Sequence, residues 1–302
     1  MIEDLNILSR FMGANTKSMR LQGFQSMAAW ERHFEENRET YNCRWRFEQN
    51  LLALGTDDLW FGWCGLCEQP VKFELPSVTA GSTPNLREEL VCRNCGTNAR
   101  VRAGLQIAKA NMDARMAQVY ITEQASPTYV WMQKNFPRVI GSEYVQNDTA
   151  RSVLQQYLAD LGGEGQIRVE DVTKLEFPDA SLDVIASFDV LEHVPDYSLA
   201  LQEFARTLRS GGLLVLTAPF ISDNQHTVVR ARLSGDGDVE HLLPPEYHGD
   251  PLGEGGILCF YHFGWDLLDV ARAAGFSEAC MALPWIPGMG LMDRLWTLTA
   301  IR

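Results

Sequence analysis

The stretch DVTKLEFPDASLDVIASFDVLEHVPDYSLALQEFARTLRSGGLLVLTAPF, Asp171 to Phe220, decides the fold class. It holds two apolar runs, LDVIASFD at 182–189 and LLVLTAP at 213–219, which are typical of buried strands. Between them a helix is predicted from Tyr197, because Asp196 can cap it and apolar residues follow at positions i, i+3, i+4 and i+7. A strand, a helix and a second strand in this order indicate parallel strands joined by a crossover helix.

The same alternation extends in both directions and predicts an α/β fold with helices on both faces of a parallel sheet. Residues 222–262 interrupt it with a segment that is too long for a simple loop, so we expect a lid or a substrate-facing insertion there. Further strands are expected at 119–122, 139–143, 167–171 and 297–302, and further helices from Pro127, at about 150–161 and at about 265–274.

Four of the seven cysteines form two C-x-x-C pairs, and 24 residues separate the pairs. In a chain without a secretion signal, this spacing predicts a metal site rather than disulfides. Four thiolates close a tetrahedral zinc site and leave no position for a substrate, so we expect the zinc to be structural. Unmetallated or redox-active cysteines are the alternatives. The predicted zinc ligands are Cys64, Cys67, Cys92 and Cys95.

Changes in composition divide the chain into three expected parts. Residues 1–55 are expected to form a helical cap, because residues 27–54 mix polar and apolar residues at helical spacing without glycine or proline. Residues 56–100 hold the cysteine pairs among short β-like pieces and are expected to form a zinc-ribbon module. Residues 101–302 carry the alternating pattern with its insertion at about 222–262.

The motifs within residues 171–220 resemble those of class I S-adenosylmethionine-dependent methyltransferases of the type 11 group. In that family an acidic residue follows the third strand, an F-P-D approach leads into the fourth, and L-E-H-V and G-G-x-L-x-x-x-x-P follow. The match is close over these residues and extends over about 117–302. It implies a Rossmann-like, doubly wound sheet of seven strands, S-adenosyl-L-methionine as the cofactor, and methyl transfer to an acceptor.

Acidic residues end three successive expected strands, at the sheet edge where such folds bind their ligands. Glu143 lies 20 residues after Glu123, a spacing at which its carboxylate can accept both ribose hydroxyls. The resemblance implies that Asp171 binds the adenine amino group, with Val172 against the ring. The residues that it places near the methionine part are Asp189 and Val190.

The first loop of the expected cofactor site lacks the glycines that the family has there. Ser126 followed by Pro127 nevertheless predicts a helix start, and the N–H groups of Thr128 and Tyr129 would then be open to a carboxylate. We expect the loop to bind the cofactor, and loss of binding is the alternative. The residues expected to contact it are Glu123 or Gln124 at the amino group, with the small residues Ala125 and Ser126.

Methyl transfer to an alcohol requires a group that removes the hydroxyl proton. His248 is the first candidate for this base, followed by His193 and His262. These histidines and His241 are also an alternative metal site, as in methyltransferases that act on catechol-like acceptors, but their spacing lacks a metal-ligand signature. We expect a small polar acceptor, with a hydroxyl of a sugar or of a secondary-metabolite intermediate as the target.

The net charge of −13 lies entirely beyond residue 118, since residues 1–118 carry 14 basic and 14 acidic residues. An acidic catalytic part repels phosphate backbones and argues against a nucleic-acid partner. An RNA methyltransferase that grips RNA with the ribbon is the alternative, because Arg87, Arg93, Arg100 and Arg102 surround the second cysteine pair. A solvated helix face explains these arginines better, since neighbouring glutamates offset their charge.

The sequence also bears on location and assembly. No apolar run is long enough to span a bilayer and the N-terminus lacks a signal sequence, so we expect a cytoplasmic protein without membrane contact. A non-catalytic interaction module that keeps the methyltransferase fold is a further alternative. Formation of a homo-oligomer is left open.

Overall fold

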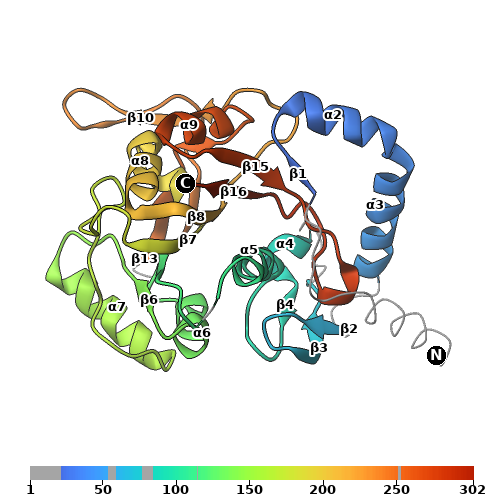
Figure 1. Cartoon of the computed structure of the whole chain (residues 1–302), viewed down its shortest axis with the longest axis horizontal. Coiled ribbons are helices and arrows are strands. Elements are labelled where there is room, and N and C mark those ends of the chain that lie inside the picture. The colour runs from blue at the N-terminus through green and yellow to red at the C-terminus, as the bar shows by residue number, and fades with distance from the viewer. Residues whose placement is uncertain (1–21, 54–58, 77–83, 114, 251–252) are drawn as a thin grey trace. The chain divides into compact units, whose positions relative to one another are not determined.

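The computed structural model describes residues 22–53, 59–76, 84–113, 115–250 and 253–302. The chain divides into two compact units, one formed mainly by residues 28–111 and 282–296 and the other mainly by residues 112–281 and 297–302 (Figure 1). Residues 282–296, which the sequence assigns to the C-terminal part, therefore belong to the first unit. Residues 1–21 of the expected helical cap lie outside the described residues.

The first unit combines helices with a small antiparallel sheet. Two helices fall within residues 27–54, where the sequence pattern predicts them. The sheet has the strand order β2-β3-β4, and a helix follows the turn after β4. The elements are α2 (Met27–Glu36), α3 (Arg38–Leu52), β2 (Leu59–Cys64), β3 (Gln69–Glu74), α4 (Leu86–Glu89), β4 (Val91–Cys92), α5 (Ala99–Ala110) and the 3₁₀ helix η2 (Pro287–Met289).

The large sheet has seven strands in the order β1-β15-β16-β8-β7-β5-β6, which confirms the α/β fold expected from the sequence (Figure 1). Strands β6, β5, β7 and β8 run parallel, whereas β16 runs antiparallel to β8. The strands are β1 (Gly23–Phe24), β5 (Val119–Ile121), β6 (Val139–Gly141), β7 (Leu182–Phe188), β8 (Leu208–Thr217), β15 (Glu278–Ala282) and β16 (Thr297–Ile301).

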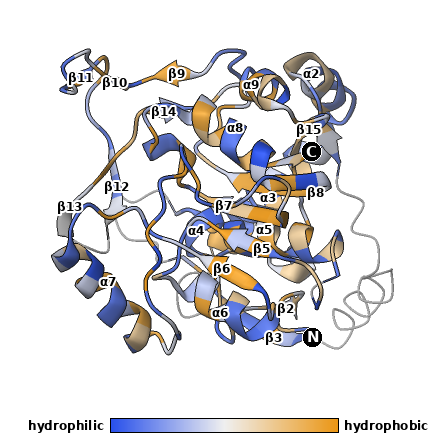
Figure 2. Ribbon diagram, turned by 60° about the vertical axis from the view of Figure 1, so that its left-hand side comes forward, coloured by the Kyte–Doolittle hydropathy of each residue, from blue (hydrophilic) through white to orange (hydrophobic). Residues whose placement is uncertain are grey.

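The parallel strands form the core of the second unit. Residues 119–121 and 184–188 are buried, as expected for strands covered on both faces. Figure 2 shows β5 and β7 in the hydrophobic colours, whereas α7 is largely hydrophilic. None of the helices in the described ranges is both long and apolar enough to cross a membrane. The helices of this unit are α6 (Pro127–Asn135), α7 (Asp148–Asp160), η1 (Leu191–His193), α8 (Tyr197–Thr207) and α9 (Leu267–Ala274).

The strand expected at 167–171 is not formed. This segment contributes an isolated parallel bridge between Glu143 and Val169, and Asp171 forms a second isolated bridge with Lys174. Because β6 already ends at Gly141, little of it is left to pair with the segment. The side chain of Gln124 takes up further backbone groups, accepting a hydrogen bond from the N–H of Arg168 and donating one to a neighbouring carbonyl.

The insertion at 222–262 is folded rather than irregular. It forms three small antiparallel pairs, β10 with β11, β12 with β13, and β14 with β9. The N–H of Phe260 donates a hydrogen bond of 2.8 Å to the carbonyl of Glu192, so the insertion is attached to the segment after β7. Its strands are β9 (Val228–Val229), β10 (Ala231–Leu233), β11 (Val239–His241), β12 (Tyr247–Asp250), β13 (Gly253–Leu258) and β14 (Tyr261–His262).

Candidate functional site

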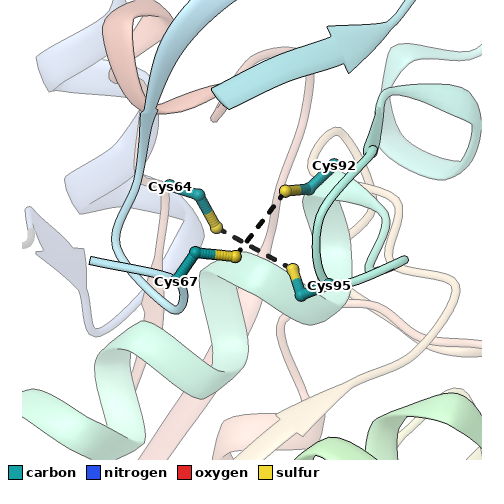
Figure 3. Close-up of side chains that lie close together, drawn as sticks. All are labelled: Cys64, Cys67, Cys92 and Cys95. Atoms are coloured by element: carbon teal, nitrogen blue, oxygen red, sulfur yellow. Dashed lines mark hydrogen bonds between the residues drawn. The ribbon is translucent and has the colours of Figure 1, made fainter. Parts of the chain in front are cut away.

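Four cysteine side chains of the first unit point toward one another (Figure 3). Their sulfur atoms all lie within 4.8 Å of one another, with 3.9 Å between those of Cys64 and Cys95 and between those of Cys67 and Cys92. Thiolates placed ~2.3 Å from a tetrahedral zinc ion stand about 3.8 Å apart, whereas a disulfide requires ~2.05 Å. The arrangement fits the structural zinc site that the sequence predicts.

Both cysteine pairs lie in turns of the same geometry. The N–H of Glu68 donates to the carbonyl of Cys64, and the N–H of Gly96 donates to the carbonyl of Cys92, each at 2.8 Å. Both donor residues have a left-handed backbone conformation, with φ of 53° at Glu68 and 71° at Gly96. Glycine adopts this conformation without strain, so Gly96 suits the second turn. The two matching turns hold the four sulfur atoms on one centre.

Arg102 is fully buried, which contradicts its assignment to a solvated helix face. Its guanidinium donates hydrogen bonds to three backbone carbonyls: that of Leu90 at 3.1 Å, that of Gly290 at 2.6 Å, and that of Thr97. The guanidinium also lies over the ring of Phe73. The sequence pattern does not predict this burial, because α5 is buried around most of its circumference instead of on one face. Arg102 therefore holds three segments of the first unit together.

The other three arginines around the second cysteine pair meet carboxylates. Arg87 and Arg100 both pair with Glu88, and Arg93 pairs with Glu74. A phosphate backbone would have to displace these carboxylates before it could bind. The arginines consequently give no support to an RNA-binding role for this module.

The loop between β5 and α6 begins the candidate cofactor site of the second unit. Ser126 caps α6 as predicted, with Pro127 in the first helical turn. The expectation that the N–H of Tyr129 is open to a ligand is wrong, because this group donates to the Ser126 hydroxyl at 3.1 Å. Gln124, Ala125 and Ser126 are buried, so the loop is packed into the unit.

Glu143 binds this loop directly. Its Oε1 atom accepts hydrogen bonds from the N–H of Gln124 at 2.7 Å and from the N–H of Ala125 at 2.6 Å. Burial raises the pKa of Glu143, although these two donors oppose the shift. The structure thus brings together the loop and the acidic residue after β6, both of which the sequence assigns to the cofactor.

Glycine at position 141 makes this approach possible. A Cβ atom at Gly141 would lie 2.7 Å from the carbonyl oxygen of Glu123 and 2.7 Å from the ring of Tyr129. Real Cβ atoms do not approach a backbone oxygen so closely. Although the β5–α6 loop lacks glycine, the neighbouring strand therefore supplies the space that the loop needs.

The remaining expected cofactor residues follow the next segments of the sheet edge. Asp171 is exposed, with its Oδ1 atom accepting hydrogen bonds from the N–H and the hydroxyl of Thr173 at 2.8 and 2.6 Å, and Val172 is half-buried. Asp189 and Val190 follow β7 directly, and the backbone of Asp189 adopts a left-handed conformation with φ of 51°. The Thr217 hydroxyl donates to Asp189 at 2.9 Å.

A second group of polar side chains lies between the end of β7 and the insertion. Glu192 is fully buried, and within the described part of the chain neither of its carboxylate oxygens has a hydrogen-bond partner. Its Oε1 atom lies 3.4 Å from Nδ1 of His248 and 3.8 Å from Nε2 of His193. Two of the three expected base candidates thus lie next to a carboxylate that the sequence analysis does not identify as a site residue.

His262, the third candidate, joins the same group through Glu246. Oε1 of Glu246 lies 3.0 Å from Nε2 of His262 and 3.2 Å from Nε2 of His248, and its Oε2 atom pairs with Arg230 at 3.1 Å. The buried Cys259 lies against these residues. His241 is exposed in β11 and is outside the group.

Contacts within the group raise the pKa of His248 and of His262. Contacts with Cys259 and Glu192 raise the pKa of His248 to about 11, against the effect of burial. Contact with Cys259 also raises the pKa of His262, and Glu246 acts in the same direction. Burial favours the neutral thiol of Cys259, but the two histidines lower its pKa overall. A raised pKa makes His248 and His262 stronger proton acceptors in their neutral forms.

Comparison with known proteins links this architecture to a family. Residues 126–216 match the family model described as "Methyltransferase domain". A 27-O-demethylrifamycin SV methyltransferase of Amycolatopsis mediterranei is 30% identical over 123 residues, which cover 39% of this chain and 45% of that protein. A dimethylglycine N-methyltransferase of Parasynechococcus marenigrum is 37% identical over 81 residues, which cover 26% and 28% of the two chains.

The matches are partial. The chain spans less than half the length of these curated relatives. Among solved structures, an S-adenosylmethionine-dependent methyltransferase from Mesorhizobium loti aligns with 67% of this chain and 98% of its own, at 16% identity and a TM-score of 0.43, a level that adds nothing to the assignment. The family model and the sequence relatives identify a methyltransferase domain that includes residues 126–216, and a four-cysteine module precedes it in the chain.

Proposed function

We propose that the protein transfers a methyl group from S-adenosyl-L-methionine to a hydroxyl of a small polar acceptor, such as a sugar or a secondary-metabolite intermediate. The observation that carries this proposal is the group around Glu192, which begins two residues beyond Val190 at the expected cofactor edge. A hydroxyl must lose its proton when it is methylated, and this group offers several proton-accepting side chains at that edge.

The residues at the sheet edge fit the cofactor. Oε1 of Glu143 is committed to the β5–α6 loop, but no described residue donates a hydrogen bond to Oε2, which is left for a ribose hydroxyl. Glu123, Gln124, Ala125 and Ser126 would line the methionine end, and Asp171 with Val172 the adenine. When bound, the cofactor supplies an electrophilic methyl group on a positively charged sulfur atom.

The reaction itself is an in-line displacement. The acceptor oxygen forms a bond to the methyl carbon while the sulfur–carbon bond breaks, and the hydroxyl proton passes to the protein. His248, His193 and His262 are the candidates to receive it, directly or through Glu192 and Glu246. Among the relatives, the rifamycin enzyme is named for an oxygen acceptor and the dimethylglycine enzyme for a nitrogen acceptor. The basic group at the edge is what favours a hydroxyl here.

The four-cysteine module would hold a structural zinc ion. The site is closed by its four thiolates, so it offers no coordination position to the acceptor. Location in the cytoplasm and the domain boundaries expected from the sequence stay predictions.

Calorimetric titration of the zinc-containing protein with S-adenosylmethionine and S-adenosylhomocysteine tests the cofactor. Mass spectrometry of sugar, phenol and amine panels incubated with protein and cofactor then tests the acceptor. We expect micromolar binding and methylation of hydroxyl compounds. Absence of binding by folded protein would reject the methyltransferase proposal, and methylation confined to amines would reject the hydroxyl acceptor. His241→Ala, outside the group, is the control variant and should behave as the wild type.

A further inference from the structure

We propose that Glu192, His193 and His248 bind a divalent transition-metal ion, distinct from the zinc of the four cysteines. One donor atom from each of these residues lies within 4.8 Å of the other two. The sequence argued against a histidine metal site because the histidines lack a ligand spacing. The fold removes this objection, since it carries His248 from the insertion to the end of β7. Binding of the ion stands on this geometry alone, and only its catalytic role rests on the proposed methyl transfer.

The buried carboxylate of Glu192 is the first reason. Its side chain is 0% exposed and both oxygens lack a hydrogen-bond partner among the described residues. An uncompensated carboxylate in such surroundings is strongly destabilising, so buried charges are normally paired or coordinate a metal. Oε1 points at two imidazole nitrogens, at 3.4 and 3.8 Å, instead of at a hydrogen-bond donor at normal distance.

The tautomers of both histidines are the second reason. Nδ1 of His193 lies 2.8 Å from the carbonyl of Leu258, which can only accept, so Nδ1 carries the proton and the lone pair of Nε2 faces Glu192. Nε2 of His248 lies 3.2 Å from Glu246, to which its N–H can donate, and a bound ion would displace the proton of Nδ1, so that the Nδ1 lone pair faces the ion beside Glu192. Metal-binding histidines almost always donate their second ring N–H to a carbonyl or a carboxylate in this way.

The separations also fit an ion. Ligand atoms at ~2.1 Å from a tetrahedral ion stand about 3.4 Å apart, close to the observed 3.4 and 3.8 Å. Two imidazoles with one carboxylate are the ligands of catalytic zinc and of non-haem Fe(II), both of which keep open coordination positions. The side chain of His248 is 30% exposed, so an open position would be reachable from solvent.

A neighbouring set, Glu246, His248 and Cys259, satisfies the same distance limit but fits less well. The two oxygens of Glu246 are already engaged by His262 at 3.0 Å and by Arg230 at 3.1 Å. Glu246 is better placed to orient His248 than to bind the ion. The competing interpretation of the whole group is an ion-free one, in which a protonated His248 lies between the carboxylates of Glu192 and Glu246.

The ion would define the acceptor more closely. An acceptor hydroxyl that occupies the open position becomes more acidic, because the metal stabilises the oxygen anion. The proton would then pass to the remaining pair, His262 and Glu246, as the oxygen attacks the methyl group. The expected acceptors are therefore compounds whose hydroxyl can ligate a metal, such as vicinal diols or phenols.

Metal content after dialysis against Zn²⁺ or Co²⁺ tests the proposal. We expect two equivalents per chain in the wild type and in His241→Ala, and one in Glu192→Gln and in His248→Ala. With Co²⁺, the thiolate site should retain its sulfur charge-transfer bands in all four proteins. Glu246→Gln should keep the second ion but weaken its binding by about 10- to 100-fold. Circular dichroism controls for misfolding of Glu192→Gln, and the partly exposed His248 offers a variant with less risk to folding.

One equivalent in the wild type, unchanged by Glu192→Gln and His248→Ala, would overturn the metal site and favour the ion-free interpretation. The cofactor titration separates this result from failure of the proposed function. Glu143→Ala should lose the cofactor and keep both metal equivalents. Two metal equivalents in a protein that binds no cofactor would leave the metal site standing and reject the methyltransferase proposal instead.

Discussion

The N–H of Ala125 donates a 2.6 Å hydrogen bond to Oε1 of Glu143, two residues beyond the end of the neighbouring strand β6. The same oxygen accepts the N–H of Gln124 at 2.7 Å. In the family, glycines let this loop approach the cofactor closely. Here the carboxylate of Glu143 holds a glycine-free loop in place through Oε1, and Oε2 is the atom that we propose to bind the ribose.

Glu143→Gln should weaken cofactor binding more than it weakens folding. The amide oxygen can still accept the two loop N–H groups, but the hydrogen bond from ribose to a charged acceptor is lost. Hydrogen bonds to charged groups are worth about 1.5–3 kcal/mol, which corresponds to a roughly 10- to 100-fold rise in Kd for S-adenosylmethionine. Glu143→Ala should in addition release the loop and lower the melting temperature.

Calorimetry and thermal unfolding of the two variants separate these effects. The exposed Glu164, changed to Gln, serves as the charge-matched control and should leave Kd unaltered. Equal Kd values for wild type and Glu143→Gln would show that ribose does not use this carboxylate.

Gly141→Ala should disturb the same loop from the side of the neighbouring strand β6. The new methyl group would lie 2.7 Å from the backbone oxygen of Glu123, which cannot move without the loop. Overpacking of this kind costs about 1–3 kcal/mol. We expect a melting temperature lowered by several degrees, roughly 2–4 °C per kcal/mol for a domain of this size, together with weaker cofactor binding.

Gly235→Ala is the matched control, because no atom of the described residues lies within 4 Å of the position of its new Cβ atom. If Gly141→Ala melted and bound cofactor like Gly235→Ala, the close approach of β6 to the loop would not matter for the site.

The sequence predicts those features that depend on local pattern. The apolar runs at 182–189 and 213–219 are strands, and Ser126 and Asp196 cap helices, because these signals lie within a few residues of one another. The strand expected at 167–171 fails for a non-local reason, since β6 is too short to pair with it and Gln124 reaches across to its backbone.

The same limit applies to the candidate site. The spacing of the C-x-x-C pairs is enough to predict their metal site. No sequence pattern indicates a role for Glu192, because its partner His248 belongs to the insertion and lies next to it only in the folded chain. For Arg102 the sequence predicts exposure, whereas the structure shows burial. Arginine is usually exposed, and only the fold reveals three carbonyl groups around it.

Arg102→Met should destabilise the first unit strongly. The substitution keeps much of the side-chain volume but leaves the carbonyls of Leu90, Thr97 and Gly290 without their donor. Each buried group left unsatisfied costs about 1–3 kcal/mol, so we expect the free energy of unfolding to fall by at least about 3 kcal/mol. Release of zinc to a chelator should accelerate in parallel, because the three segments surround the cysteine module.

Arg93→Gln provides the comparison for this variant. Arg93 pairs with Glu74 on the surface, where their side chains are 54% and 49% exposed, and such pairs contribute about 0–1 kcal/mol. Chemical denaturation followed by tryptophan fluorescence measures both variants. A loss in Arg102→Met no larger than that in Arg93→Gln would contradict the structural role assigned to the buried guanidinium.

Glu203 should make the stability of the second unit depend on acid pH. Its carboxylate accepts hydrogen bonds from Arg206 at 2.7 and 2.8 Å and from the N–H of Leu175 at 2.8 Å. The hydrogen bonds with Arg206 are the main reason that the pKa of Glu203 is lowered in the folded protein. A lowered pKa means that the stabilisation is complete above the pKa of the unfolded chain and is lost as the pH falls through the folded value.

Glu203→Gln should therefore unfold at a lower temperature than the wild type at pH 7, and the difference should shrink as the pH falls below about 4, where glutamates of an unfolded chain are protonated. The exposed Glu176, changed to Gln, controls for the loss of one negative charge. Calorimetric melting curves between pH 3 and pH 7 measure the effect. A difference that stayed constant across this range would mean that the ionised carboxylate does not stabilise the fold and that Glu203 acts only through its packing.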